Sequence, residues 1–174
     1  MELARKNLLL TGRPGVGKTT LIKKLSEALK PFHPVGFYTD EIREGGVRKG
    51  FELVTLDGRR QILSHVGIKG PFRVGKYGVD IAGFETFFDA IDFLSPATRL
   101  VIIDEIGKME CLSGKFRTLL REILNLQKSL IATIALRGDG IIAEIKGRRE
   151  TILLEVTARN RDSILSEVLM SIRR

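Results

Sequence analysis

A glycine-rich motif near the N-terminus constrains the fold of this chain more than any other feature. Residues 12–19 read GRPGVGKT and match the pattern G-x-x-x-x-G-K-[ST]. The apolar run at residues 7–10 precedes the motif, and residues 18–30 follow it with apolar side chains at helical spacing. A strand, a glycine loop and an amphipathic helix in this order predict a phosphate-binding loop (P-loop).

Each residue type in this motif has a physical role. Gly12, Gly15 and Gly17 permit backbone angles and close approaches that a side chain would block. The loop can then turn its N–H groups toward phosphates, and the following helix adds the positive end of its dipole. Lys18 supplies a positive charge to the β- and γ-phosphates, and Thr19 supplies a hydroxyl ligand for Mg²⁺. The motif therefore predicts binding of a nucleoside triphosphate with Mg²⁺.

A second motif follows a fully apolar run. Residues 100–103 read as a buried strand that ends at Asp104 and Glu105. Parallel strands end at one edge of the sheet, where ligands bind. We therefore expect Asp104 to hold Mg²⁺, directly or through water, and Glu105 to orient or polarise the attacking water.

Further cations are expected near this site, because the protein's part in phosphoryl transfer is mainly positioning and charge neutralisation. The candidates are Arg13, Lys108, Arg137, Arg159 and Arg161, and for each a solvated surface position is an equally good reading. Residues 157–162 follow the last predicted strand. From the residues alone, this segment is better read as a polar loop that caps the next helix.

The rest of the chain alternates apolar runs with amphipathic segments. Strands are predicted at residues 7–10, 35–39, 51–55, 61–65, 100–103, 130–136 and 151–156, and helices at 18–30, 80–94, 114–127, 141–146 and 163–172. Residues 40–78 hold eight of the 18 glycines and read as a β-rich insertion. The expected fold is one α/β domain over residues 1–174, with a mostly parallel central sheet and helices on both faces.

Composition limits the class of protein. The net charge of +8 suits polyanionic partners such as nucleotides, but basic residues are spread along the chain as on a solvated surface. No apolar run approaches the roughly 18–20 residues of a membrane span. The first residues also lack a signal-peptide pattern, so a cytoplasmic protein without membrane contact is expected. Few Asn, Gln and Cys beside many Lys, Arg and Glu are typical of proteins from hot environments.

Five segments of the sequence together resemble a known family. They are GRPGVGKT at 12–19, GFYTDEIREGGVRKGF at 36–51, VGKYGVD at 74–80, DEIGKME at 104–110 and VTARNRD at 156–162. In this order they resemble the small P-loop nucleoside-triphosphatases first noted in thermophiles and related to vertebrate cancer-related nucleoside-triphosphatase. The resemblance implies a RecA-like variant of the P-loop NTPase fold. It also implies slow, Mg²⁺-dependent hydrolysis of ATP, GTP, CTP and UTP with broad base tolerance.

The motif and the resemblance together give a predicted set of site residues. Lys18 and Glu105 are the catalytic candidates, and Thr19 and Asp104 are the metal ligands. The nucleotide-binding set is Gly12, Arg13, Pro14, Gly15, Val16, Gly17, Lys18, Thr19, Thr20, Asp104, Glu105, Ile106, Gly107, Lys108, Asn160 and Arg161.

Two other functions stay open at this stage. A small nucleotide or nucleoside kinase fits the chain length, and residues 137–149 would serve as a basic lid. The paired acids at 104 and 105 and the lack of an acceptor-pocket motif count against it. A nucleic-acid-dependent ATPase fits the positive charge but is not favoured. The sequence leaves the physiological substrate, pathway, partner and oligomeric state open.

Overall fold

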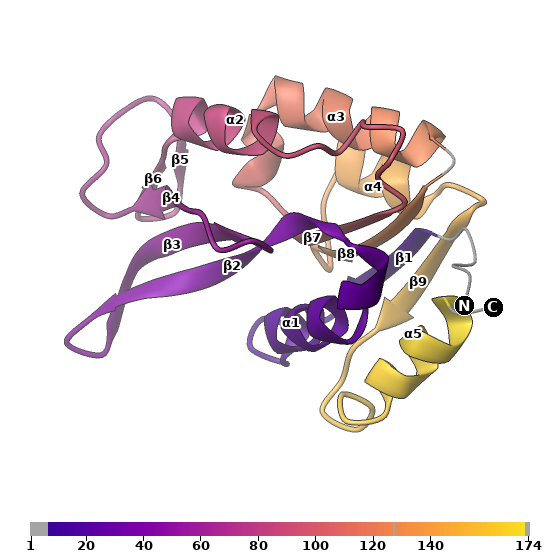
Figure 1. Ribbon diagram of the computed structural model, residues 1–174. Coiled ribbons are helices and arrows are strands. Elements are labelled where there is room, and N and C mark those ends of the chain that lie inside the picture. Colours follow the sequence, from indigo (N-terminus) through magenta and orange to yellow (C-terminus); the bar gives the residue numbers. More distant parts are fainter. Residues whose placement is uncertain (1–6, 127, 173–174) are drawn as a thin grey trace.

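The computed structural model describes residues 7–126 and 128–172, and a nine-stranded sheet forms its centre (Figure 1). The strand order is β5-β6-β4-β3-β2-β7-β8-β1-β9. The strands are β1 (Asn7–Thr11), β2 (Val35–Glu44), β3 (Val47–Thr55), β4 (Arg60–His65), β5 (Arg73–Val74), β6 (Tyr77–Val79), β7 (Leu100–Ile106), β8 (Ser129–Ile134) and β9 (Thr151–Glu155). The α-helices are α1 (Lys18–Ala28), α2 (Ile81–Asp89), α3 (Gly114–Asn125), α4 (Ile141–Lys146) and α5 (Ile164–Ile172), with 3₁₀ turns η1 (Lys30–Phe32) and η2 (Glu110–Leu112).

Five neighbouring strands of this sheet are parallel. They are β2, β7, β8, β1 and β9. They include β1, which precedes the P-loop, and β7, which carries Asp104 and Glu105. Every residue of β1 and β8 is buried. Helices cover both faces of these central strands, which is why their sequences are apolar without alternation.

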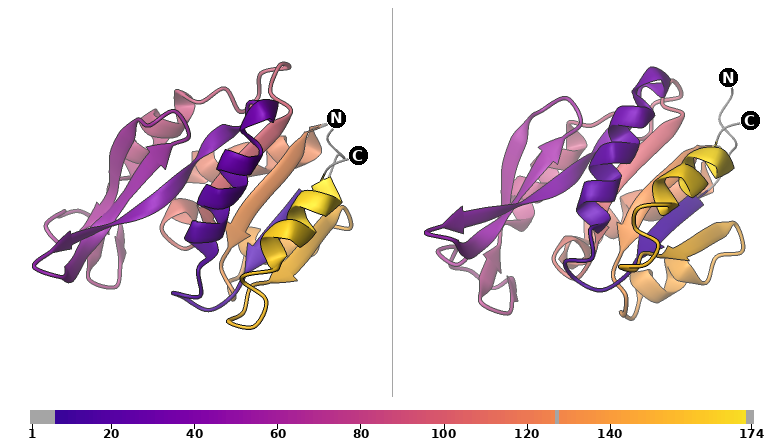
Figure 2. Two further views of the ribbon diagram at one scale, coloured as in Figure 1. Left: turned by 60° about the horizontal axis from the view of Figure 1, so that its bottom comes forward. Right: turned by 90° about the horizontal axis from the view of Figure 1, so that it is seen from below.

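The helices lie in two layers on opposite faces of the sheet (Figures 1 and 2). Helices α1 and α5 cover one face, where Ile22 and Val168 pack with Leu8 and Leu10 of β1. Helices α2, α3 and α4 cover the other face, where the rings of Phe84 and Phe116 meet with centroids 4.9 Å apart. The predicted α/β architecture with helices on both faces is confirmed.

The glycine-rich part of the chain extends the sheet beyond β2. Strands β3, β4, β6 and β5 add to it in antiparallel fashion. The long β2–β3 hairpin projects from the body of the molecule in Figure 1 and turns at Gly45 and Gly46, whose φ angles of 55° and 78° favour glycine. The predicted β-rich insertion therefore exists, and it begins within β2 and continues the central sheet.

Several element ends differ from the prediction. β7 continues through Asp104 and Glu105 to the fully buried Ile106, because Ile106 still pairs with Ile134 of β8 after a shift in register. β8 ends at Ile134, two residues before the predicted end. Helix α1 ends at Ala28 and α2 at Asp89, in each case before a turn that buries an apolar side chain, Leu29 after α1 and Phe93 after α2.

The predicted strands at 35–39 and 51–55 are longer in the structure, because β2 and β3 pair along the whole hairpin, and β5 and β6 were not predicted. The other predicted boundaries are close to the observed ones. Ser113 is the N-cap of α3, because its hydroxyl oxygen accepts a hydrogen bond from the N–H of Phe116 at 3.0 Å. Gln127, the last residue of that predicted helix, lies outside the described residues, as do residues 1–6, on which the signal-peptide argument depends.

Candidate nucleotide-binding site

The P-loop connects β1 to α1 at the carboxyl edge of the parallel strands. Gly12 opens it with φ 147°, and a Cβ at this position would lie 2.4 Å from the carbonyl oxygen of Val156. A side chain is therefore excluded where the loop passes the end of β9. Gly17, with φ 110°, is the N-cap of α1. The Nζ of Lys18 donates hydrogen bonds to the carbonyls of Gly12 (2.9 Å) and Arg13 (3.0 Å), so its ammonium lies over the start of the loop.

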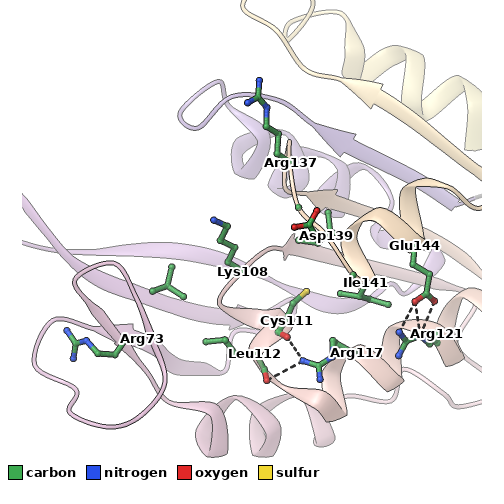
Figure 3. Close-up of a pocket in the computed structure, with 14 residues that line it drawn as sticks. Arg73, Lys108, Cys111, Leu112, Arg117, Arg121, Arg137, Asp139, Ile141 and Glu144 are labelled. Carbon is green, nitrogen blue, oxygen red and sulfur yellow. Dashed lines mark hydrogen bonds and ion pairs between the residues drawn. The ribbon is translucent and has the colours of Figure 1, made fainter.

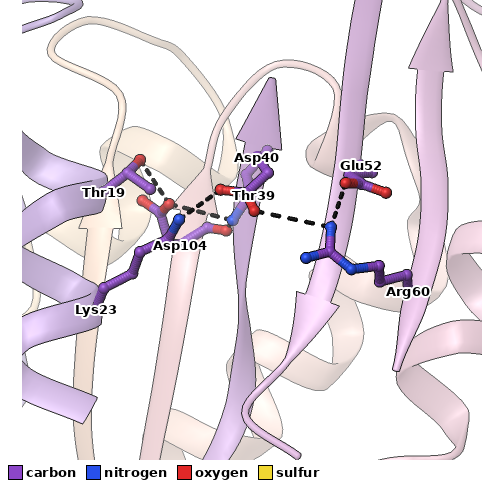
Figure 4. Close-up of polar contacts among 7 residues, drawn as sticks. All are labelled: Thr19, Lys23, Thr39, Asp40, Glu52, Arg60 and Asp104. Carbon is purple, nitrogen blue, oxygen red and sulfur yellow. Dashed lines mark hydrogen bonds and ion pairs between the residues drawn. The ribbon is translucent and has the colours of Figure 1, made fainter. Parts of the chain in front are cut away.

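Asp104 is the buried acid of the site, with 2% of its surface exposed. Its Oδ2 accepts hydrogen bonds from the hydroxyl of Thr19 (2.7 Å) and the N–H of Thr39 (3.3 Å), as Figure 4 shows. Its Oδ1 accepts a hydrogen bond from the hydroxyl of Thr133 (2.6 Å). Burial raises the pKa of Asp104, and these hydrogen bonds oppose that rise. The structure therefore brings together Thr19 and Asp104, which are 85 residues apart in sequence.

Two further carboxyl groups lie beside Asp104. Burial first, and then the negative charge of Asp104, raises the pKa of Glu105, while Lys18 lowers it. Glu110 is buried, and burial together with the charge of Glu105 raises its pKa. A Cβ on Gly107 would lie 2.9 Å from Oε1 of Glu105 and 3.0 Å from Oε2 of Glu110. The two carboxyl groups therefore flank Gly107, which has no room for a side chain unless they move.

The oxygen atoms around Asp104 suit a hard divalent cation. A hydroxyl and a carboxylate in contact are ligands that Mg²⁺ accepts, and Mg²⁺ usually takes its remaining ligands from water and phosphates. Three carboxyl groups with raised pKa values indicate that positive charge would stabilise their ionised forms. Among residues 7–126 and 128–172, no group of three or more His, Cys, Asp or Glu is placed to hold a metal ion. A site completed by phosphate and water is consistent with that finding.

A charged network continues from this site across the sheet. The Nζ of Lys23 on α1 lies 2.5 Å from Oδ1 of Asp40 and 4.5 Å from the ring centre of Tyr38. Arg60 lies 3.9 Å from Asp40 and also pairs with Glu52 (Figure 4). These contacts tie α1 to the β2–β3–β4 part of the sheet, next to Thr39.

Sequence reasoning missed Thr39 and Thr133 as partners of Asp104. Thr39 also donates its hydroxyl hydrogen bond to the backbone carbonyl of Asp104 at 2.6 Å. Thr39 belongs to the GFYT segment, which is one of the segments that carry the family resemblance. This signal could have drawn attention to it. Thr133 stands inside an apolar run, and only the pairing of β8 with β7 brings it beside Asp104.

The candidate cations are exposed and lie on four different loops. Arg13 is exposed on the P-loop. Lys108 and Arg137 are exposed and line a cavity between the loops after β7 and β8 (Figure 3). Arg159 and Arg161 are exposed in the loop after β9. Their predicted contacts with the phosphates or base stay predictions.

The other predicted nucleotide-binding residues have varied surroundings. Pro14, Gly15 and Thr20 are exposed, and the partly buried Val16 packs against the α1–α5 core. Ile106 is fully buried in the opposite core, so its side chain is committed to packing. Asn160 accepts a hydrogen bond from the N–H of Thr157 (2.7 Å) and donates one to the carbonyl of Glu155 (2.8 Å). Its amide thus holds the loop after β9 in shape.

Comparison with known proteins gives the family. A family model described as NTPase matches residues 7–169. The chain belongs to this NTPase family. Its members include nucleoside-triphosphatase THEP1 of Thermotoga maritima, which is 45% identical over 163 residues, covering 93% of this chain and 92% of that protein. Human cancer-related nucleoside-triphosphatase is 41% identical over 186 residues, covering 97% of each chain. The resemblance predicted from the motifs is therefore confirmed.

A solved structure from the NTPase family confirms the fold as well. The crystal structure of THEP1 from the hyperthermophile Aquifex aeolicus matches with a TM-score of 0.84 at 36% identity, covering 97% of this chain and 99% of that one. The predicted P-loop NTPase fold is therefore correct. In the described part of the chain, no helix has the length and apolar character needed to span a membrane.

Proposed function

We propose that this protein is a Mg²⁺-dependent nucleoside-triphosphatase that releases phosphate and leaves a nucleoside diphosphate. The observation that carries the proposal is the 2.7 Å contact between Thr19 of the P-loop and Asp104 of β7, with the Lys18 ammonium over the same loop. These are the residue types that phosphoryl transfer in P-loop proteins requires. The names of the relatives from Thermotoga maritima and human agree with this activity.

Thr19 and Asp104 would hold the metal ion, and Thr39 and Thr133 would keep the Asp104 carboxylate in place. Bound Mg²⁺ supplies positive charge to the phosphate oxygens and stabilises the charge that develops in the transition state. Lys18 would exchange its contacts with the Gly12 and Arg13 carbonyls for the β- and γ-phosphates. The N–H groups of the loop and the start of α1 would bind the remaining phosphate oxygens.

Glu105 would orient and polarise the water that attacks the γ-phosphate. It follows the metal-ligand candidate directly, and its carboxyl is in the field of Lys18. A raised pKa makes its carboxylate a stronger proton acceptor than an ordinary glutamate, which suits a general base. Gly107 and Lys108 follow in the same loop, so we place Lys108 among the residues that neutralise phosphate charge.

We further propose that ATP, GTP, CTP and UTP are all substrates. The backbone cradle, Lys18 and Mg²⁺ recognise phosphates and do not contact the base. No segment of the sequence resembles an element that hydrogen-bonds one base edge. Strong discrimination requires a buried polar site that the wrong ligand leaves unpaired. Weak contacts from Asn160 and Arg161 would allow the specificity constants to differ by no more than about two orders of magnitude.

A phosphate-release assay over these four triphosphates, with and without Mg²⁺, tests the proposal. We expect release that needs Mg²⁺, no added acceptor and no nucleic acid. The values of kcat/KM should fall within about a hundredfold of one another. Release that begins only when a nucleoside or nucleotide acceptor is added would identify a kinase instead. A large stimulation by DNA or RNA that is lost at higher salt would identify a nucleic-acid-dependent ATPase.

A further inference from the structure

A large cavity opens at the same edge of the sheet as the P-loop site, and of its lining residues the proposed hydrolysis uses Lys108 alone (Figure 3). Its volume is about 1010 Å³, at the upper end of the roughly 300–1,000 Å³ that small-molecule sites occupy. It lies between the loop after β7, the loop after β8, the start of α4, helix α3 and the β5 strand. These elements come from four separate parts of the sequence, so no single motif could have indicated the cavity.

The charge on the cavity wall is positive. Five cationic side chains line it, namely Arg73, Lys108, Arg117, Arg121 and Arg137, against the two acids Asp139 and Glu144. Arg121 and Glu144 neutralise each other, because the guanidinium donates three hydrogen bonds of 2.7 to 3.2 Å to that carboxylate. Four cations and one acid remain to act on a ligand.

These remaining cations have donors to spare. Among the residues that the structure describes, Lys108 and Arg137 have no hydrogen-bond or ion-pair partner. Arg73 donates to the carbonyls of Lys76 (3.0 Å) and Ile68 (3.5 Å), and Arg117 donates to the carbonyl of Cys111 (2.6 Å). A guanidinium has five N–H donors, so both arginines keep free donors while these contacts hold their side chains in place.

The same cavity has an apolar side. Ile141 and Ile142 at the start of α4 belong to the core, and Val74 and Leu112 pack against that core. A free inorganic anion would leave this surface unused. A molecule that joins a phosphate group to an apolar or aromatic body would use both sides.

The cavity and the P-loop lie at the same edge of the sheet. Lys108 directly follows Gly107, which the carboxyl groups of Glu105 and Glu110 flank. Arg137 follows the end of β8 by three residues, and the carbonyl of Ile134 at that end accepts a hydrogen bond from the hydroxyl of Thr11 (3.0 Å), the residue before the P-loop. A ligand in the cavity would therefore lie at the same sheet edge as the triphosphate.

We propose that this cavity is a second ligand site that binds an organic phosphomonoester next to the bound nucleoside triphosphate. Arg73, Arg117 and Arg137, which Figure 3 shows spread around the cavity, would attract its phosphate group, and the Ile141–Ile142 surface would bind its ring or apolar body. Lys108 is left to the triphosphate. Charge-assisted hydrogen bonds from arginine are the strongest contacts available to a phosphate, so they dominate the affinity. This site goes beyond the proposed hydrolysis and does not depend on it.

The test uses AMP as the probe and isothermal titration calorimetry on the full chain, with saturating ADP and Mg²⁺ present to fill the P-loop. We expect one AMP per chain and no comparable binding of adenosine, which lacks the phosphate. Arg73→Gln should weaken AMP binding about tenfold, and Arg73→Gln/Arg137→Gln should weaken it further. Arg99→Gln is the matched control, because Arg99 is exposed at the opposite end of β7, and it should bind AMP as the wild type does.

Three results would overturn the proposal. They are absence of AMP binding to the ADP-filled protein, equal binding of adenosine and AMP, and unchanged AMP affinity in the Arg73→Gln/Arg137→Gln variant. Phosphate release from ATP, measured on the same proteins without ADP, reports separately on the proposed hydrolysis. Thermal unfolding of each variant shows whether a lost signal comes from a lost contact or from a lost fold.

Discussion

Thr133 of β8 donates a 2.6 Å hydrogen bond to Oδ1 of Asp104 on the neighbouring strand β7. The two side chains meet at the carboxyl edge of the sheet, and Asp104 meets Thr19 of the P-loop through its other carboxylate oxygen. We therefore propose Thr133 as a positioning residue for the predicted metal ligand, although it lies in an apolar segment of the sequence.

The first prediction follows from this contact. Thr133→Val keeps the shape of the side chain and leaves one oxygen of the buried Asp104 carboxylate without a donor. Loss of an outer-shell partner typically lowers metal affinity about 10- to 100-fold, so the Mg²⁺ concentration for half-maximal phosphate release should rise by about that factor. Thr118→Val on the exposed side of α3 is the control and should leave the Mg²⁺ dependence unchanged. An unchanged dependence in Thr133→Val would remove Thr133 from the site.

The second prediction separates binding from chemistry at Glu105. Glu105→Gln keeps the size of the side chain and removes the carboxylate that polarises water. Turnover should fall at least about a hundredfold, as expected for loss of a general base. ATP binding in the presence of Mg²⁺, measured by calorimetry, should persist. If turnover stays near normal, another residue positions the water and Glu105 is an acid at the end of the site without a catalytic role.

The third prediction concerns Glu110 and pH. Burial and the charge of Glu105 raise the pKa of Glu110 above the value of about 4.3 expected in the unfolded chain. Between these two pKa values the folded state binds more protons, so the free energy of unfolding decreases as the pH rises. Glu110→Gln cannot ionise, so in the absence of Mg²⁺ it should match the wild type near pH 4 and be more stable than the wild type at pH 9.

Urea unfolding at both pH values measures this difference, at constant ionic strength. Glu122→Gln on α3 is the matched control, because Glu122 is exposed, and its stability should follow that of the wild type at both pH values. A Glu110→Gln variant with the same stability difference from the wild type at pH 4 and pH 9 would show that Glu110 does not titrate between them.

Much of the fold was predictable because its signals are local. The P-loop, the buried strands and the helix capped by Ser113 each depend on residues close together in sequence. The extension of β7 to Ile106 was not predictable, because pairing with Ile134 of another strand maintains it. Residues 40–78 were correctly predicted to be rich in β-structure, but β5, β6 and the sheet order were not predicted, since glycine-rich turns do not specify which strand pairs with which.

The site residues likewise fall into a group that local motifs predict and a group that they do not. The glycine motif and the acid pair at 104 and 105 identified the P-loop and its companion strand. The partners Thr39 and Thr133, the carboxyl of Glu110 beside Gly107 and the cationic cavity all arise from contacts between elements distant in sequence. A lone threonine in an apolar run carries no sign that it hydrogen-bonds a buried acid. Such residues become visible only when the strand register is known.

The fourth prediction tests the central claim, that triphosphate hydrolysis takes place at the P-loop. Lys18→Ala removes the charge that binds the β- and γ-phosphates and should leave the fold intact, because Lys18 contacts the loop carbonyls and not the core. Lys24→Ala is the matched control, since Lys24 is exposed on the same helix. Thermal unfolding of both variants checks that each is folded.

The decisive measurement is the rate of phosphate release from ATP with saturating Mg²⁺ for the wild type, Lys18→Ala and Lys24→Ala. The rate should fall at least about a hundredfold in Lys18→Ala, as for removal of a group that stabilises transition-state charge, and stay at the wild-type level in Lys24→Ala. A folded Lys18→Ala protein that releases phosphate at the wild-type rate would contradict hydrolysis at the P-loop.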